Sequence, residues 1–247
     1  MSDVSSSEIR QEFAKSKVGL VGIGILASLI ILSAVAVITI PIDTFKQWNN
    51  PGKWISYPKT SVPIWINYFM TEKIPEHLIL DNPSAITKDD IISLTSHQFS
   101  VQYYYDDFPS DFIYEFSVEY SGSQLLQISV IRPDQSQILL LSRSLPHSDT
   151  NIIHHERIFS TDNTIKKNIQ IHFSEMGFYN QSTSSEDMIF ANKDGQVLKG
   201  DYLFLLNIYG VEEKVKIIDS KLILGGKAFG MMGTDELRRD LAVGLLW

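Results

Sequence analysis

Cysteine is missing from this chain of 247 residues. Its absence excludes disulfide bonds and thiolate metal sites, so an exported domain must be stabilised by its hydrophobic core alone. About 190 residues follow the N-terminal apolar segment described below, which is enough for a domain to bury a sizeable core.

Basic residues are also scarce, with 21 Lys and Arg against 29 Asp and Glu and a net charge of −8. Residues 1–40 carry three basic and three acidic side chains, so the whole surplus of negative charge lies beyond them. The sequence has no cluster of Lys and Arg of the kind that contacts a phosphate backbone. We therefore expect no nucleic-acid partner.

Catalytic motifs are missing too, since the sequence contains no Gly-rich phosphate loop, no nucleophile elbow and no HExxH motif. Asp106 and Asp107 are adjacent carboxylates, which could serve in acid–base catalysis or calcium binding. Adjacent residues on a strand point to opposite faces, so a solvated turn is the favoured interpretation. Imidazole and carboxylate groups can bind zinc, but their spacing here matches no zinc-ligand motif. The residues concerned are His147, His154, His155, Glu156 and His172. We expect no catalytic residue, no cofactor, no metal site and no enzymatic activity.

A run of 23 uncharged residues, 18–40, is the longest apolar feature of the sequence. At about 1.5 Å per residue a helix of this length reaches roughly 35 Å, and the hydrocarbon core of a membrane is about 30 Å thick. A buried core helix would show a polar side, which this run lacks. A cleaved signal peptide is the stronger alternative because Ala34-Val35-Ala36 has small-x-small spacing, but its apolar region would be shorter. We predict a retained transmembrane helix.

The orientation of this helix is not decided by flanking charge, because three basic residues precede it and three follow within about twenty residues. These residues are Arg10, Lys15, Lys17, Lys46, Lys53 and Lys59. Long domains cross membranes largely regardless of their charge. We therefore place residues 1–17 in the cytoplasm and residues 41–230 outside the plasma membrane.

Residues 41–95 form a predicted connector that is rich in aromatic residues and proline. Aromatic side chains next to a span favour the headgroup region, and proline at this density disfavours regular helices and central strands. The segment is therefore expected to run extended over the membrane surface or the base of the domain, with ordinary loop packing as the alternative. Residues 87–95 are a candidate short helix, because Asp89 and Asp90 would lie in its first turn.

Period-two alternation of apolar and polar residues, the pattern of half-buried strands, begins near residue 96. It is clearest over residues 112–120, and turn residues predict hairpins at 124–131 with 137–142 and at 188–192 with 196–198. Further strands fit residues 165–173, 202–209 and 214–218. Short strands separated by turns predict a mostly-β, sandwich-like domain over residues 96–230.

The C-terminal segment, residues 231–247, has the pattern of a helix that starts and then becomes apolar. Thr234 suits an N-cap, and Asp235 and Glu236 place negative charge in the first turn. The following residues carry no charge and no stop signal. We predict an amphipathic helix leading into a second membrane helix, and hence a fragment of a longer membrane protein.

Two stretches of sequence resemble the dipeptide and oligopeptide ABC-importer permeases. Residues 8–40 read EIRQEFAKSKVGLVGIGILASLIILSAVAVITI, like the opening of these subunits, and residues 233–246 read GTDELRRDLAVGLL, like the family pattern GTDxxGRDxxxxLLxG. The matching positions of the second motif are Gly233, Thr234, Asp235, Arg239 and Asp240. Arg238 stands where the family usually has glycine, which indicates close helix packing or a special backbone angle there.

The resemblance implies a permease subunit of a peptide importer with a large external β domain. It also implies as partners a second permease subunit, two ATP-binding subunits, an extracellular substrate-binding protein and the lipid bilayer. Two other classes stay open. One is a single-pass, membrane-anchored β-sandwich that serves in binding, adhesion or sensing. The other is an anchored hydrolase, for which the sequence offers no convincing nucleophile, base or metal cluster.

Overall fold

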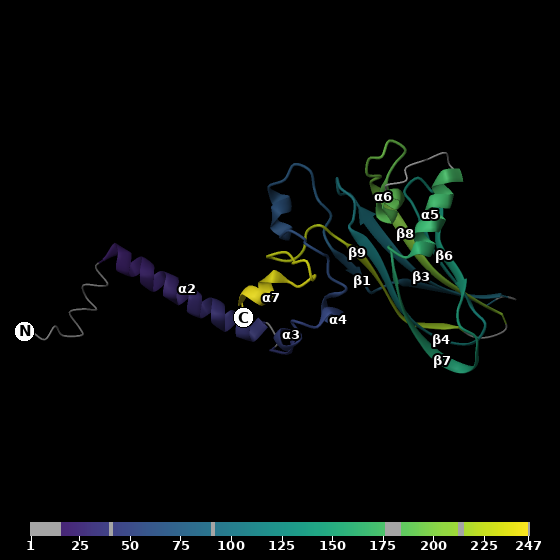
Figure 1. Cartoon of the computed structure of the whole chain (residues 1–247), viewed down its shortest axis with the longest axis horizontal. Helices are drawn as coiled ribbons and strands as arrows, with labels where there is room; N and C mark the ends of the chain where they lie inside the picture. The colour runs from purple at the N-terminus through teal and green to yellow at the C-terminus, as the bar shows by residue number, and fades with distance from the viewer. Residues whose placement is uncertain (1–15, 40–41, 90–91, 176–183, 212–214, 247) are drawn as a thin grey trace, which may run out of the picture.

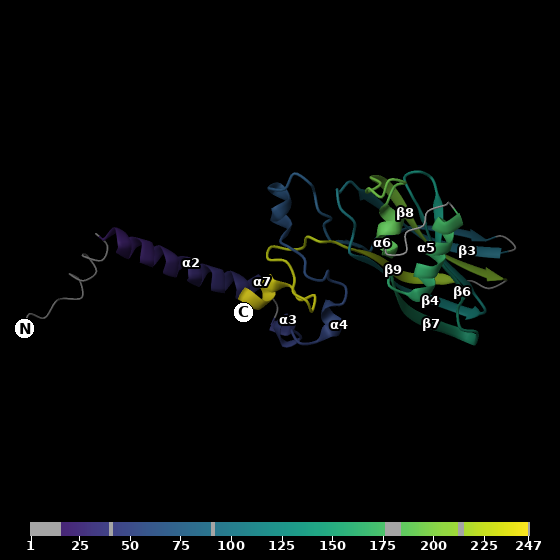
Figure 2. The same ribbon diagram turned by 45° about the horizontal axis from the view of Figure 1, so that its top comes forward.

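The computed structural model describes residues 16–39, 42–89, 92–175, 184–211 and 215–246. An N-terminal helix projects from one end of a two-layer β domain, and a compact neck of short helices and loops joins the two (Figures 1 and 2). The predicted fold class, an apolar helix followed by a β-sandwich, is confirmed. The predicted cytoplasmic tail lies almost wholly outside the described residues.

The N-terminal helix α2 (Lys17–Thr39) has 23 residues, and its start is capped by Ser16, whose Oγ accepts from the Gly19 N–H at 3.3 Å. Nearly all of its side chains are exposed, and Ala36 is a buried exception. Within the described residues, Lys17–Ile38 is the one helix long and apolar enough to cross a membrane, with a mean hydropathy of 2.8. Length and composition therefore suit a membrane anchor or a signal sequence.

The neck, defined as residues 42–77 and 226–246, combines segments from both halves of the chain. It contains three short helices before the β domain and one after it. Their bounds are α3 (Ile42–Lys46), α4 (Pro51–Trp54), the 3-10 helix η1 (Ile64–Tyr68) and α7 (Leu241–Leu246). The prediction of an extended connector is therefore wrong in part, because proline at the first position of α4 starts a helix with Asn50 as its cap.

Two antiparallel sheets make the β domain. One has four strands in the order β1-β9-β4-β7 and the other has five in the order β2-β3-β8-β5-β6. The first sheet contains β1 (Leu78–Leu80), β4 (Asp111–Gly122), β7 (Ser148–Phe159) and β9 (Lys216–Gly225). The second contains β2 (Ser84–Asp89), β3 (Ile92–Tyr103), β5 (Leu125–Ile131), β6 (Gln137–Ser144) and β8 (Gly200–Val211).

The core lies between the two sheets and is rich in aromatic rings. Alternate residues of β4 and β8 face inward, so Tyr114 and Phe204 meet with ring centroids 6.3 Å apart. Two buried polar contacts also connect β3 with the opposite sheet, one at β9 and one at the residue just before β9. His97 Nδ1 lies 2.7 Å from Ser220 Oγ, and Thr95 Oγ1 donates to the Val215 carbonyl at 3.0 Å. These contacts satisfy polar groups that would be costly to bury alone.

Several sequence-based strand predictions are confirmed. Residues 112–120 lie in β4, residues 202–209 lie in β8, and the hairpin at 124–131 with 137–142 is the β5–β6 pair. Residues 216–218 of the predicted strand 214–218 begin β9, which continues to Gly225.

The strand predicted at residues 165–173 is wrong, because this segment forms the helix α5 (Asn163–Glu175). Ile165, Ile169 and Phe173 recur every four residues and are buried, so a helical face packs on the sheet edge at β6. Asp162 Oδ1 accepts from the Thr164 N–H at 2.8 Å at the helix start. The alternation of Ile169, Ile171 and Phe173 concealed this longer period.

Two further predictions fail, one in part and one wholly. Of the predicted hairpin at 188–192 with 196–198, the tip is confirmed by an antiparallel bridge between Ala191 and Val197, but residues 188–190 belong to the helix α6 (Ser185–Phe190), which Ser184 caps by accepting from the Asp187 N–H. The predicted helix 87–95 is instead the antiparallel β2–β3 pair, in which Thr87 lies opposite Thr95. Pairing with a neighbouring strand outweighs the weak helix signal of Asp89 and Asp90.

The amphipathic helix predicted across residues 231–247 is wrong. Residues 233–240 form a tight turn closed by an antiparallel bridge between Thr234 and Asp240, and the helix α7 covers only Leu241–Leu246. Asp235 explains the difference, because its Oδ1 accepts from the N–H groups of Leu237 and Arg239, each at 2.9 Å. A side chain that satisfies its own turn competes with helix formation.

Candidate functional site

The five residues singled out by sequence, Gly233, Thr234, Asp235, Arg239 and Asp240, lie together in the neck. The Thr234 hydroxyl is buried and fully used, because it donates to the Pro58 carbonyl at 2.8 Å and contacts both the amide and the hydroxyl of Ser61. These contacts join segments 173 residues or more apart in sequence. Thr234 therefore fastens the C-terminal segment to the neck rather than capping a helix.

Close backbone approach accounts for Gly233. Its φ is +76°, and a Cβ placed there would lie 2.2 Å from the Ser61 carbonyl oxygen, so only glycine fits. Asp235 and Arg239 form an ion pair at 2.7 Å, and the Arg239 guanidinium lies 4.7 Å from the centroid of the Trp48 ring. Asp240 Oδ1 accepts from the Ala242 N–H at the start of α7, and burial raises the pKa of its carboxyl.

Arg238 occupies the left-handed backbone region, with φ +64°. Its guanidinium donates to the Tyr57 carbonyl at 2.6 Å and to Asp111 Oδ2 at 2.8 Å. Asp111 is the first residue of β4. Arg238 thus connects the neck to the sandwich, and this whole group of residues has a structural role.

A second cluster of polar side chains lies on the outer face of the four-stranded sheet. The inward alternation of β4 leaves Glu115, Ser117 and Glu119 on the opposite side. Strand register places Arg157 and Lys221 on either side of Glu115, and His155 and Asp219 on either side of Ser117. We call these seven residues the polar face.

Hydrogen bonds and ion pairs connect the polar face across its strands. Arg157 Nε donates to Glu115 Oε1 at 2.8 Å, and His155 Nδ1 lies 2.7 Å from Ser117 Oγ. Ser56 of the neck donates to Glu115 at 3.1 Å, so the polar face begins where the neck ends. A shallow hollow of about 290 Å³ lies here and is lined by residues that include Glu115, His155, Arg157 and Asp219.

The remaining histidine candidates do not gather into a metal site. His154 and Glu156 lie near the β6 edge, where Glu156 pairs with Arg143 and sits 3.3 Å from His154 Nε2. Burial, with the charge of Arg143, lowers the pKa of His154. His147 contacts Ser123 and Asp149 on the surface, and His172 lies on α5. Among the described residues, no group of three potential ligands is close enough to hold a metal ion.

Asp106 and Asp107 lie in the turn after β3, as the sequence predicts. Each pairs with lysine, Asp106 with Lys199 and Asp107 with Lys227 at 2.7 Å. The hydrogen bond from Lys199 is the leading cause that lowers the pKa of Asp106, followed by that from the Lys73 amide. Paired with lysines in this way, the two carboxylates stabilise the junction of neck and sandwich.

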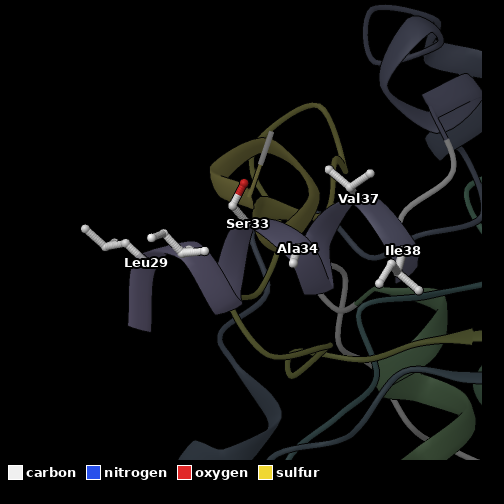
Figure 3. A pocket seen from close by; sticks show the side chains of 6 residues that line it. Leu29, Ser33, Ala34, Val37 and Ile38 are labelled. Atoms are coloured by element: carbon white, nitrogen blue, oxygen red, sulfur yellow. The ribbon is translucent and has the colours of Figure 1, made fainter. Parts of the chain in front are cut away.

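A hollow also runs along α2, and all six residues that line it belong to this helix. Figure 3 shows Leu29, Ser33, Ala34, Val37 and Ile38 along this stretch, with Ser33 the one polar side chain. An apolar surface of this kind suits contact with hydrocarbon, and it offers few groups for binding a polar ligand.

Sequence reasoning did not find the polar face. Its residues appear in the sequence as the wet side of alternating strands, a pattern that most exposed sheet faces share. What makes them a cluster is the register of β9, β4 and β7, which brings residues 115, 155 and 219 together from distant parts of the chain. The alternation reveals the face of each strand but not its neighbours.

Neither a protein-family model nor a curated protein matches the sequence. Among solved structures, the chain is similar to TmCBM61 in complex with beta-1,4-galactotriose, at 8% identity and TM-score 0.26, over 64% of this chain and 90% of that one. It is also similar to carbohydrate-binding modules from the beta-sandwich super family, at 4% identity and TM-score 0.27, over 69% and 62% of the chains. A carbohydrate-binding module specific for non-crystalline cellulose, CBM28, aligns at 7% identity and TM-score 0.26, over 69% and 96%. Likenesses this weak carry no information about a ligand.

The permease prediction is wrong on these findings. The described residues form one apolar helix and a two-sheet β domain, and they include no second helix that is long and apolar enough to cross a membrane. The motif that suggested a second membrane helix is a turn packed inside the neck. The predicted partners of a permease, including the second permease subunit, the ATP-binding subunits and the substrate-binding protein, are withdrawn with it, as is peptide transport. The fold defines a β-sandwich carried on an N-terminal apolar helix.

Proposed function

We propose that the chain is a membrane-anchored β-sandwich that presents a binding surface outside the plasma membrane. The proposal rests on how the helix, the neck and the sandwich are arranged. An exposed apolar helix of 23 residues is joined by a hydrogen-bonded neck to a sandwich whose polar face begins beside that neck. This arrangement supports the single-pass binding, adhesion or sensor alternative.

The chemistry of the polar face suits a neutral ligand with many hydrogen-bonding groups. Two cations, Arg157 and Lys221, lie among the three anions Glu115, Glu119 and Asp219, so the face has no strong field of one sign. The exposed imidazole of His155, which is hydrogen-bonded to the buried Ser117 hydroxyl, adds a group that can donate or accept a hydrogen bond. Binding is proposed rather than catalysis, and the expected lack of enzymatic activity remains a prediction.

Binding is tested with the full chain in lipid nanodiscs against a panel of soluble neutral polysaccharides and neutral peptides. We expect Arg157→Ala and His155→Ala to weaken the best interaction at least about tenfold, because each removes a polar group that is hydrogen-bonded across strands. Lys166→Ala, an exposed change on α5, is the matched control. An interaction that both polar-face variants leave unchanged would place the binding surface elsewhere.

Anchoring is tested by alkaline extraction of membranes that contain the full chain. Wild-type protein should stay with the lipid. Replacing both Leu26 and Leu29 near the middle of α2 with arginine should release it, since each central arginine costs about 2.5–3.5 kcal/mol of insertion free energy. Extraction of the wild-type chain into the soluble fraction would refute the anchor.

A further inference from the structure

Several large apolar side chains of the neck are exposed. They come from η1, the residues just after it, and the segment that follows β9. We call this cluster the aromatic patch, and its members are Trp65, Tyr68, Phe69, Met70, Met231 and Met232. Tyr68 is 84% exposed and Phe69 is 83% exposed, although rings of this size are usually at least half buried in a folded domain.

The patch is held in place by contacts beneath it. Trp65 Nε1 donates to the Met231 carbonyl at 2.9 Å, and the Trp65 and Phe69 rings meet edge to face at 6.3 Å. Asn67, on the buried side of η1, exchanges hydrogen bonds with the backbone of Ile74 at 3.0 and 3.1 Å. Lys73 donates to the Met70 carbonyl at the end of this turn. The exposed rings therefore stand on an ordered support.

Exposure is selective among the neck aromatics. Trp54 is 2% exposed and packs edge to face against Trp48 and Tyr57, while Tyr57 packs against Phe229. Some aromatic side chains of the neck therefore form its core, and others are exposed on its surface. Packing within the chain does not explain the second group.

The position of the patch relative to α2 indicates what covers it. In both views η1, the short blue helix, lies level with α3 and α7 along the long axis of the molecule, just past the C-terminal end of α2 (Figures 1 and 2). If α2 crosses a bilayer, this level is the boundary between hydrocarbon and headgroups. Tryptophan and tyrosine are enriched at that boundary, because their rings are apolar and their polar ends remain wet.

We propose that the aromatic patch is a second membrane contact, in which Trp65, Tyr68 and Phe69 enter the headgroup region of the bilayer that α2 spans. The proposal rests on the proposed function, since it requires α2 as anchor. Two separated contacts on one rigid neck would fix the tilt of the sandwich, so that its polar face keeps one orientation to the membrane. The occupant is the lipid surface itself, which continues from the end of α2 to the patch.

The test uses the absence of cysteine, which makes any introduced cysteine a unique spin-label site. Full chains carrying Tyr68→Cys, Phe69→Cys, Leu29→Cys or Asp149→Cys are reconstituted in phosphatidylcholine vesicles. Collision rates with oxygen and with a water-soluble nickel complex report the depth of each label. We expect position 29 in the hydrocarbon, positions 68 and 69 at the headgroup boundary, and position 149 in water.

The outcomes separate this proposal from the anchor. Labels at 68 and 69 that behave like the label at 149, while the label at 29 is buried in lipid, would overturn the second contact alone. An aqueous label at 29 would overturn the proposed anchor, and this inference with it.

A measurement without labels guards against disturbance of the patch by the cysteine variants. Lipids brominated near the headgroup end of the acyl chain quench nearby tryptophan fluorescence. Trp65→Phe should remove a large share of the quenchable signal, whereas Trp54→Phe, which changes a buried ring, should not. Equal quenching in wild type and Trp65→Phe would contradict contact of this ring with lipid.

Discussion

At the scale of single residues, the neck is stabilised by a few side chains that hydrogen-bond to segments distant in the sequence. Thr234 and Arg238 each connect two distant segments, and both are removed from most solvent. Losing a partner in such a place leaves other polar groups unpaired, which costs more than the hydrogen bond itself contributes. The first two predictions concern these residues, and the third concerns a histidine of the neck whose ring nitrogens are buried.

Thr234→Val should loosen the neck locally. The methyl group replaces a hydroxyl that pairs with Ser61 and Pro58, so we expect a loss of about 1–3 kcal/mol. Hydrogen exchange of the peptide containing the Ser61 amide should then accelerate about tenfold or more. Thr150→Val, at an exposed strand position, should leave that exchange unchanged. Unchanged exchange in Thr234→Val would show that the hydroxyl does not hold this junction.

Arg238 allows the backbone and side-chain contributions to be separated. Arg238→Ala loses the contacts to Tyr57 and Asp111 and keeps a non-glycine residue at φ +64°. Arg238→Gly loses the same contacts but relieves the left-handed strain, by about 1 kcal/mol. Both variants should be less stable than wild type in thermal unfolding, and the alanine variant should be the less stable of the two. A glycine variant less stable than the alanine variant would contradict the left-handed φ of residue 238.

His77 should make stability depend on pH. Burial lowers its pKa to about 4, with the nearby charge of Asp111 opposing that change and the charge of Arg238 adding to it. The unfolded chain therefore binds more protons between pH 4 and the ordinary value of 6.5, so this stability is present above pH 6.5 and is lost as pH falls toward 4.

The measurement is the unfolding temperature of wild type and His77→Gln between pH 7 and pH 4. The variant should lose less stability over this range, although His97, whose pKa burial also lowers, should keep part of the dependence. His147→Gln, which changes an exposed side chain, is the control. Parallel curves for wild type and His77→Gln would mean that His77 is not buried in its neutral form.

At the scale of elements, the sequence predicts what depends on length and local pattern. The N-terminal apolar helix follows from an uncharged run, and the β5–β6 hairpin follows from alternating strands around the Arg132-Pro133-Asp134-Gln135 turn. Predictions failed where the sequence fits both the period of a strand and that of a helix, and contacts with distant residues decide which one forms. α5 is helical because Ile165 and Ile169 both reach the sheet edge, and the 233–240 turn forms because Ser61 and Pro58 take the partners that a helix cap would need.

The polar face lay beyond sequence prediction for a related reason. Its residues come from three strands whose pairing requires long connections, so the register appears only in the folded sheet. The same applies to the neck, where residues near 60 and near 234 meet. A prediction from one segment contains no information about the other.

Point changes in α5 can distinguish the helix from the strand predicted at first. Ile169→Ala should cost about 2–5 kcal/mol because this side chain is fully buried. Ile171→Ala should change stability by less than about 0.5 kcal/mol, since Ile171 is 46% exposed on the helix. On a strand, positions 169 and 171 would share one face. Equal losses in denaturant unfolding of the two variants would therefore contradict the helix.

At the scale of the whole molecule, an N-terminal apolar helix, a neck and a β-sandwich follow one another. The end of α2 packs near α7, and the neck contacts the sandwich through Arg238, Ser56 and Lys227. Because these contacts come from several directions, the sandwich should keep a defined position relative to the anchor. Its polar face would then be presented to partners from a constant height above the membrane.

The proposed function requires that the sandwich stands outside a membrane that α2 crosses. The most direct measurement places one cysteine at Lys193, an exposed position in the loop after α6, or at Ser5 in the N-terminal tail, and treats intact cells with a membrane-impermeant maleimide. We expect labelling at position 193 in intact cells and labelling at position 5 only after the membrane is permeabilised. The opposite pattern, or labelling of both positions in intact cells, would contradict it.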